Sequence, residues 1–119
     1  MLKENQIYVK VGEARFVATL NDSAAAKELM AMLPRTWKME ELNGNEKYYF
    51  LPQKKFTVKE TTPGQVKAGD LVLWQDNAVV LFYEGHRNTY AYTTLGAIDD
   101  PEGLAEAVGA GAVEIEFSR

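Results

Sequence analysis

Residues 69–85 read GDLVLWQDNAVVLFYEG, and this stretch decides the fold. It holds two apolar runs, rich in branched and aromatic residues, on either side of the polar triplet 75–77. Short runs of this kind between turn residues are typical of buried β-strands. We therefore predict two neighbouring strands joined by a tight turn at 75–77. For function, the question is whether Trp74, Leu81 and Tyr83 line a groove or fill a core.

Further strands are predicted on both sides of this stretch. Apolar residues alternate with polar ones over residues 7–20, and the pair Gly12-Glu13 interrupts the alternation. Glycine supplies the positive φ that a type II′ turn requires, so this segment is a predicted β-hairpin. Short alternating or aromatic runs between turn residues recur over 35–56, 90–98 and 112–117.

Two short helices are predicted between the strands. The first helix is preceded by a residue that can cap its free backbone amides, and a proline ends it. The second helix has an acidic cap, a proline at its first position and a glycine at its end. These signals are Asp22 or Ser23 with Pro34 for the first helix, and Asp100, Pro101 and Gly109 for the second. About eight strands and two short helices favour a mainly β fold, a closed eight-stranded barrel capped by two α-helices, as a single domain over residues 1–119.

Composition excludes several classes of function. The chain has 119 residues, is 46% hydrophobic and carries a net charge of −4 without a basic run, so we expect no nucleic-acid partner. It has no cysteine, which excludes disulfides and cysteine-rich zinc sites. No segment has the apolar length of a signal peptide core or a membrane span, so we expect a soluble cytoplasmic protein without a membrane partner.

Residues with catalytic chemistry are scarce. The only histidine is His86, in a turn-like segment, and no serine stands in a nucleophile motif. The pair Asp99-Asp100 is explained by helix capping. The acidic residues Glu40, Glu41 and Glu46 are better read as a solvated strand face than as a cation site, because hard cations need several convergent oxygens. We therefore predict no catalytic residue, no metal and no cofactor.

The order of these segments resembles the cyclophilins, and more closely a group of small prokaryotic cyclophilin-like proteins of unknown function. The resemblance rests on the stretch 69–85, followed by TTLGAI and GLAEAV, and on a G-x-E-x-Y-F-like segment around residues 44–50. It covers nearly the whole chain. It implies an eight-stranded barrel with a groove on one outer face, where cyclophilins bind proline-containing peptides and isomerise the X-Pro bond.

The chain departs from that family at the groove. Cyclophilins place an arginine in the strand that corresponds to EKYYF, residues 46–50, and none of the four arginines here lies in it: they are Arg15, Arg35, Arg87 and Arg119. Lys47 is the nearest cation, and a compact ammonium is a poor substitute for a planar guanidinium. Trp74 stands where the family has a small residue, and Tyr92 where it has a groove histidine.

The cyclophilin register would direct alternate residues of the strand around position 81 to opposite faces. It predicts Val79, Leu81 and Tyr83 on the groove side, with Val80 and Phe82 in the barrel interior. A slip of one residue would reverse these assignments. The candidate groove residues are Tyr48, Phe50, Trp74, Leu81, Tyr83, Tyr92 and, at the rim, His86.

Two functions of different class follow. The first is a non-enzymatic binding module whose aromatic groove takes a peptide or a small-molecule ligand. The alternative is a weak peptidyl-prolyl cis-trans isomerase, which rests on analogy of fold. A hydrolase or lyase ranks last because no nucleophile is accompanied by a base. Both a monomer and a homodimer are compatible with the sequence.

Overall fold

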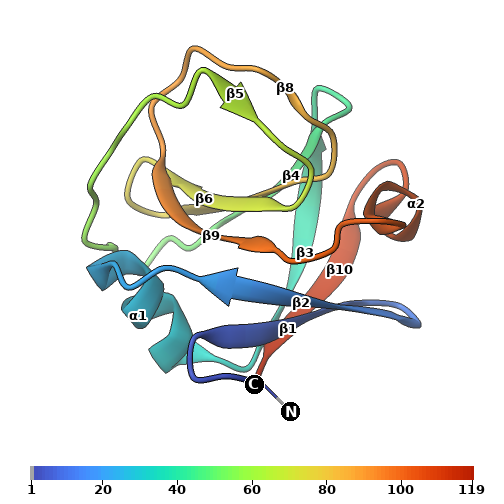
Figure 1. Cartoon of the computed structure of the whole chain (residues 1–119), viewed down its shortest axis with the longest axis horizontal. Coiled ribbons are helices and arrows are strands. Elements are labelled where there is room, and N and C mark those ends of the chain that lie inside the picture. The colour runs from blue at the N-terminus through green and yellow to red at the C-terminus, as the bar shows by residue number, and fades with distance from the viewer. Residues whose placement is uncertain (1) are drawn as a thin grey trace.

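Residues 2–119, described here by a computed structural model, form a closed barrel of eight antiparallel strands (Figure 1). The order around the barrel is β1-β10-β3-β4-β7-β6-β9-β2, so the first and last strands of the chain pair and close it. The predicted fold class is therefore confirmed. The barrel strands are β1 (Gln6–Val11), β2 (Ala14–Leu20), β3 (Arg35–Leu42), β4 (Glu46–Phe50), β6 (Asp70–Trp74), β7 (Ala78–Phe82), β9 (Thr93–Ile98) and β10 (Val113–Ser118).

The predicted turns lie where the sequence placed them. In the β1–β2 hairpin, Val11 pairs with Ala14, and Gly12 has a φ of +57° while Glu13 has no positive φ, as a type II′ turn requires. In the β6–β7 connection, Trp74 pairs with Ala78 and leaves the triplet 75–77 as the turn.

A second, two-stranded sheet lies outside the barrel. It consists of β5 (Gln65–Val66) and β8 (His86–Arg87), and Figure 1 shows it standing apart from the barrel wall on the side of β4 and β6. The segment 59–71 is mostly polar and carries Pro63-Gly64, a pattern typical of a surface connection, yet Val66 is only 1% exposed. It packs against Val80 and Phe82 on the outer face of β7. The barrel wall is therefore covered on both faces at this point.

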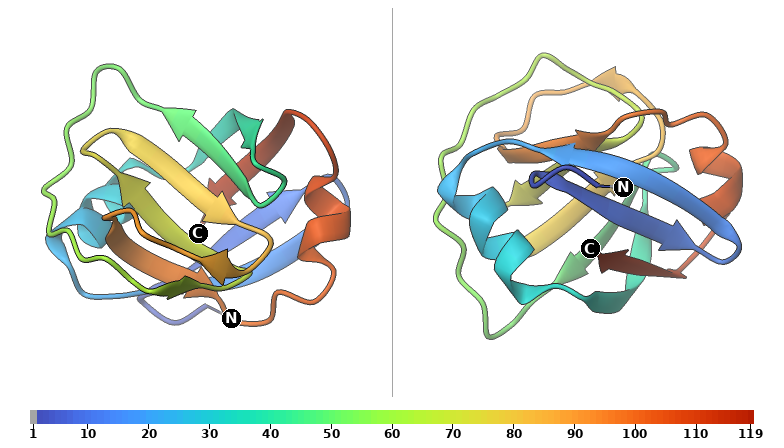
Figure 2. Two further views of the ribbon diagram at one scale, coloured as in Figure 1. Left: turned by 90° about the horizontal axis from the view of Figure 1, so that it is seen from above. Right: turned by 60° about the horizontal axis from the view of Figure 1, so that its bottom comes forward.

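The two helices lie on opposite sides of the barrel in every view (Figure 2). In α1 (Ala24–Met32), the hydroxyl of Ser23 accepts a hydrogen bond from the backbone amide of Ala26, so the cap is Ser23 rather than Asp22. Leu29 is the residue of α1 that points deepest into the barrel core.

The second helix is shorter than predicted. It begins at Leu104, so α2 comprises Leu104–Val108, and its N-cap is Gly103 with a φ of +84°. The predicted cap, Asp100, instead accepts a hydrogen bond from the amide of Glu102 in the turn before the helix. Pro101 also precedes the helix, because the left-handed Gly103 separates it from the first helical residue. The predicted stop at Gly109 is correct.

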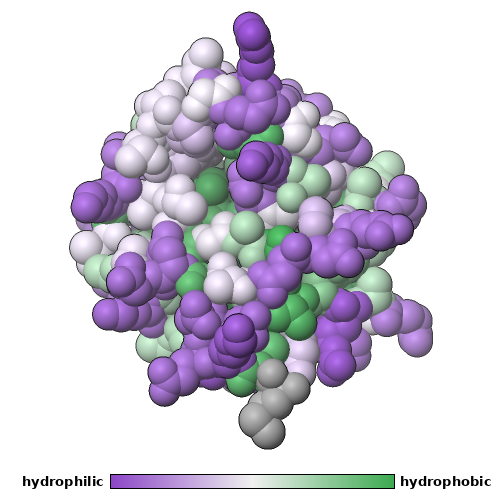
Figure 3. All heavy atoms as spheres, viewed as in Figure 1, coloured by the Kyte–Doolittle hydropathy of each residue, from purple (hydrophilic) through white to green (hydrophobic). Residues whose placement is uncertain are grey.

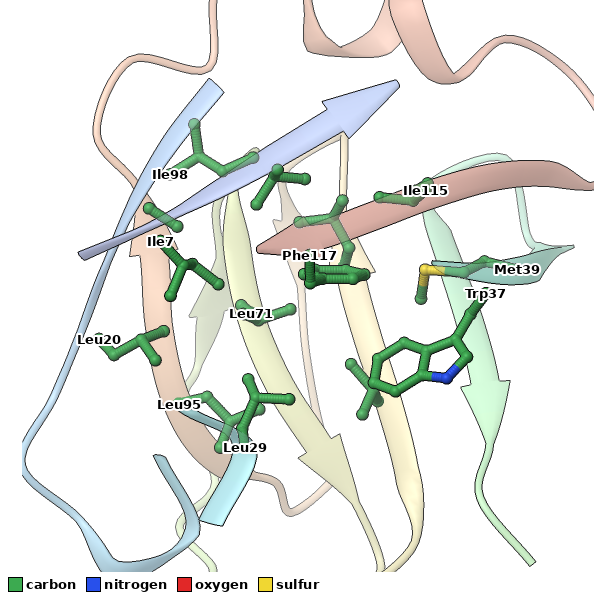
Figure 4. Packing of buried hydrophobic residues seen from close by; sticks show 14 of the residues in the cluster. Ile7, Leu20, Leu29, Trp37, Met39, Leu71, Leu95, Ile98, Ile115 and Phe117 are labelled. Atoms are coloured by element: carbon green, nitrogen blue, oxygen red, sulfur yellow. The ribbon is translucent and has the colours of Figure 1, made fainter. Parts of the chain in front are cut away.

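Branched and aromatic side chains fill the barrel interior (Figure 4). Ile7, Leu71, Leu95 and Phe117 are fully buried and come from four different strands. Alternate residues of most strands supply this core, whereas in β9 the core residues Leu95 and Ile98 are three positions apart, where the pairing with β6 is irregular. In β10, Ile115 and Phe117 are fully buried, and Val113 packs against the core.

The predicted orientation of β7 is wrong. Val79 and Leu81 belong to the barrel core, whereas Val80 and Phe82 lie on the outer face beneath the β5–β8 sheet. The pairing Tyr48–Val80 places Tyr48 on the same outer face. The physical reason is that all five residues of β7 are buried, because the core covers one face and the small sheet covers the other. An apolar strand of this kind carries no alternation from which the face could be read.

Candidate functional site

An open cleft of about 330 Å³ lies on the outer face of β4, β7 and β6. The β3–β4 turn borders it at one side, and β8 with the loop that follows borders it at another. Five aromatic side chains line it: Tyr48, Phe50, Trp74, Tyr90 and Tyr92. Leu42, Asn43, Glu46, Ala78, Val80 and His86 complete the lining.

Strand parity brings the central residues of this cleft together. Glu46, Tyr48 and Phe50 alternate along β4, so all three side chains leave the barrel on its outer face. Across the sheet, Ala78 pairs with both Phe50 and Trp74. The small side chain of Ala78 leaves space between the two rings, whose centroids are 6.2 Å apart.

Exposed apolar surface is concentrated at the cleft. On the face seen in Figure 3, hydrophilic side chains surround several small apolar areas. Among the described residues, five large hydrophobic side chains are exposed, and four of these line the cleft; they are Leu42, Phe50, Trp74 and Tyr90. A group of exposed apolar residues in one concave place is a mark of a binding site.

Among the described residues, Glu46 is the one acidic residue that lines the cleft. It is 7% exposed, and among residues 2–119 its carboxylate makes no hydrogen bond or ion pair. Burial, followed by repulsion from Glu41, raises the pKa of Glu46 to about 7. The cleft therefore contains a carboxyl group that changes its charge near neutral pH and that the chain itself does not satisfy.

Tyr92 and His86 line the same cleft as this carboxyl group. Tyr92 is 4% exposed, and burial, together with the charge of Glu46 and the neighbouring Tyr90, raises its pKa to about 12, so its hydroxyl remains a donor. The amide of Asn45 donates a hydrogen bond of 3.3 Å to Nδ1 of His86. Both rings pack against Phe82, at centroid distances of 5.6 Å for Tyr92 and 5.4 Å for His86.

Lys47 does not reach the cleft. Its side chain leaves β4 on the inner face and is fully buried. The ammonium donates to the Glu41 carboxylate at 2.8 Å and to the carbonyl oxygens of Gly109 and Gly111 at 2.8 and 2.6 Å. Desolvation alone would raise the pKa of Glu41, but hydrogen bonds from Lys47 and Tyr83 hold it below the usual value. Through these hydrogen bonds, Lys47 thus connects the segment after α2 to the barrel wall.

The predicted groove residues separate into two groups. Five of them line the cleft together: Tyr48, Phe50, Trp74, His86 and Tyr92. The other two were predicted on the wrong side of β7. Leu81 is fully buried in the barrel core. Tyr83 packs against that core, and its hydroxyl donates a hydrogen bond of 2.7 Å to Glu41. Burial and this contact with the Glu41 carboxylate raise the pKa of Tyr83 to about 12.

Two residues of the cleft were missed in the sequence. Glu46 lies two and four positions before Tyr48 and Phe50, which were predicted groove residues, so the same alternation indicated its face. It was read instead as part of a solvated acidic strand. Tyr90 lies two positions before Tyr92, within the predicted strand 90–98, so alternation also indicated its face, although β9 begins only at Thr93.

The other acidic side chains do not converge. Glu41 is engaged by Lys47 and Tyr83, and no group of three metal-binding side chains occurs within the described part of the chain. Within residues 2–119, no arginine or lysine lines the cleft. Over residues 2–119, no helix is long and apolar enough to cross a membrane.

Comparison with known proteins identifies the family. The sequence profile of the cyclophilin-like family matches residues 9–118. The fold resembles the solution structure of a hypothetical protein from Archaeoglobus fulgidus, with a TM-score of 0.64 and 20% sequence identity over 98% of this chain and 95% of the other. No curated protein matches the sequence.

Proposed function

Because this chain belongs to the cyclophilin-like family and presents an open aromatic cleft on its barrel wall, we propose that it is a binding module for a small molecule or a short peptide segment. The observation that carries the proposal is the gathering of four of the five exposed large hydrophobic side chains in one concave site. Leaving these groups in water costs folding free energy, which a bound ligand would recover.

The dimensions of the cleft support a ligand of modest size. A volume of about 330 Å³ lies at the lower end of the range for small-molecule sites. Trp74 is 38% exposed and forms part of the wall rather than filling the space. Its ring meets Phe50 at 63°, and Phe50 meets Tyr48 at 74°, so three rings line the site in succession.

The alternative, peptidyl-prolyl isomerisation, has weaker support. The activity of cyclophilins is attributed to a groove arginine, and none of the residues lining this cleft is an arginine or a lysine. The barrier to rotation about a peptide bond is about 18 to 20 kcal/mol, and its reduction requires a donor placed on the twisted amide. Tyr92 offers one neutral hydroxyl for this purpose.

Tryptophan emission provides a test of binding. Titration with a library of metabolites and short peptides should change the emission of Trp74, which lies in the cleft. The matched control is Trp74→Phe, in which the remaining Trp37 is 6% exposed within the core and should not respond. A library that leaves the wild-type emission unchanged, with amide resonances around the cleft also unmoved, would argue against a binding module.

A protease-coupled assay on a proline peptide separates the two functions. We expect a rate equal to that of the uncatalysed reaction. An acceleration that Tyr92→Phe abolishes would instead establish the isomerase.

A further inference from the structure

We propose that the cleft recognises a small organic ammonium ion, held between the carboxylate of Glu46 and the surrounding aromatic rings. This specificity rests on the proposed binding function. Three features of the cleft support the proposal: a carboxylate with no partner among the described residues, the rings that line the same space, and a described lining that suits no other kind of charged ligand.

Among the described residues, Glu46 has no hydrogen-bonding or ionic partner, and its carboxylate borders the open cleft. Buried carboxylates in proteins are normally paired with a cation or hydrogen-bonded, because desolvation of an isolated charge is costly. The neighbouring Lys47 shows that this chain satisfies a buried charge where the fold needs one, since its ammonium has three oxygen partners. Glu46 is 7% exposed, lines the cleft and has no such partner among the described residues. A ligand cation would supply it.

The aromatic lining suits the same ion. An ammonium over the face of tryptophan or tyrosine is attracted by the ring quadrupole, and several rings together recognise methylated ammonium groups. Tyr48, Phe50 and Trp74 line one part of the cleft, and Tyr90 and Tyr92 another. Rings alone would also accept a neutral apolar ligand, so the carboxylate determines the preference for a cation.

Other charged ligands fit poorly. An anion would meet Glu46 without an arginine or lysine to offset it, because neither residue lines the cleft. A hard metal cation needs several oxygen ligands, and Glu46 is the one carboxylate present. An organic cation needs a single counter-charge together with apolar surface, and the cleft provides both.

Choline and its neutral isostere 3,3-dimethylbutan-1-ol provide the test, because they share a shape and differ in charge. Chemical shifts of the cleft residues, including the Trp74 indole, would be followed during titration at pH 8. We expect choline to bind the wild-type protein about tenfold more tightly than the isostere does. Glu46→Gln should remove this difference while keeping the shape of the side chain. Glu114→Gln, at an exposed position on β10, should preserve it.

The pH dependence provides a second readout, because choline keeps its charge at every pH. Choline should bind about tenfold more weakly at pH 5.5 than at pH 8, since protonation of Glu46, whose pKa is raised to about 7, removes the counter-charge. The titratable groups around Glu46 are Glu41 on β3, Tyr48 on β4, Tyr83 after β7, His86 on β8, and Tyr90 and Tyr92 after β8. The dependence should persist in His86→Gln and disappear in Glu46→Gln.

The outcomes separate this inference from the function on which it rests. Equal binding of choline and its isostere, unaffected by Glu46→Gln, would overturn the cation assignment and leave the binding module in place. If neither compound shifts a resonance of the cleft, the cation assignment is also overturned, and the library titration then decides independently whether the cleft binds anything.

Discussion

Glu46 and Lys47 are adjacent on β4, and their opposite charges lie on opposite faces of the barrel wall. Lys47 points inward and has three oxygen partners, whereas Glu46 points outward into the cleft and has none among the described residues. The first arrangement is that of a structural ion pair. The second leaves a charge whose burial costs stability, which is the pattern expected of a residue kept for binding.

Replacement of Lys47 should destabilise the fold. Lys47→Met leaves Glu41 without its cation and two carbonyl oxygens, those of Gly109 and Gly111, without their donor. We expect the free energy of unfolding to fall by about 3 kcal/mol, the usual cost of breaking a buried pair. Urea denaturation measures this value. Lys38→Met, at an exposed position on β3, should change it by less than about 0.5 kcal/mol. A loss below about 1 kcal/mol for Lys47→Met would contradict the structural role.

Glu46 should make the stability depend on pH. Its pKa is raised to about 7 in the folded protein from a usual value of 4.5, so folding favours the protonated form. The wild-type protein should therefore lose stability as the pH rises through this interval, with little further change above it. Between pH 5 and pH 8 we expect a loss of about 2 kcal/mol relative to Glu46→Gln, somewhat below the value for the full pKa difference because the cleft is open to water. Parallel pH profiles for the two proteins would refute the assigned cause.

At the scale of elements, β7 and the β5–β8 sheet explain how the cleft is built. The inner face of β7 belongs to the barrel core, and its outer face supports Val66 and Tyr92. The small sheet therefore borders the cleft next to the aromatic residues of β4 and β6. The isolated pairing of Thr61 with Tyr92 fastens the loop that carries Tyr92 to the strand-like segment before β5.

At Gly96 in β9, the neighbouring strand β2 leaves no room for a side chain. A Cβ atom added there would collide with the carbonyl oxygen of Thr19 and lie 2.8 Å from the Cα of Leu20. Gly96→Ala should therefore separate β2 from β9 and lower the free energy of unfolding by about 3 kcal/mol or more. Thermal denaturation measures the effect. Gly64→Ala is the matched control, since a Cβ there meets nothing within 4 Å and its φ is not positive; it should be neutral.

At the scale of the whole molecule, the core and the outer apolar cluster share the wall formed by β6 and β7. Leu71, Leu73, Val79 and Leu81 face the core, while Val72, Val80 and Phe82 face the outer cluster. Loss of packing in one cluster would therefore disturb the strands that support the other. The barrel and the cleft should therefore unfold together.

Single-tryptophan variants test this coupling. Trp74→Phe leaves Trp37 as a reporter of the core, and Trp37→Phe leaves Trp74 as a reporter of the cleft. In each variant, the fluorescence midpoint in urea should coincide with the midpoint from far-ultraviolet circular dichroism. A Trp74 transition that precedes the loss of strand signal would show that the cleft opens as a separate unit.

Local patterns were sufficient for much of the fold. Three features depend only on residues that are close in sequence. They are the hairpin turn at Gly12, the helix cap before α1 and the turn at 75–77. The start of α2 was misplaced because an aspartate-proline pair also begins a simple turn, and the left-handed Gly103 postpones the helix. Tyr48, Phe50, Trp74, His86 and Tyr92 were chosen for the groove and do line one cleft.

The sequence by itself determined a mainly β chain with two short helices and an order of strands that resembles the cyclophilin barrel, because alternation and turn chemistry are local properties. Only the tertiary structure decided which face of β7 meets the core, because both of its faces are apolar and the covering strand β5 lies far away in the chain. The tertiary structure also decided that the Lys47 ammonium has three oxygen partners inside the barrel, whereas the Glu46 carboxylate lies in the cleft without a partner among the described residues. The sequence could not show this, because the partners of a buried charge come from distant segments.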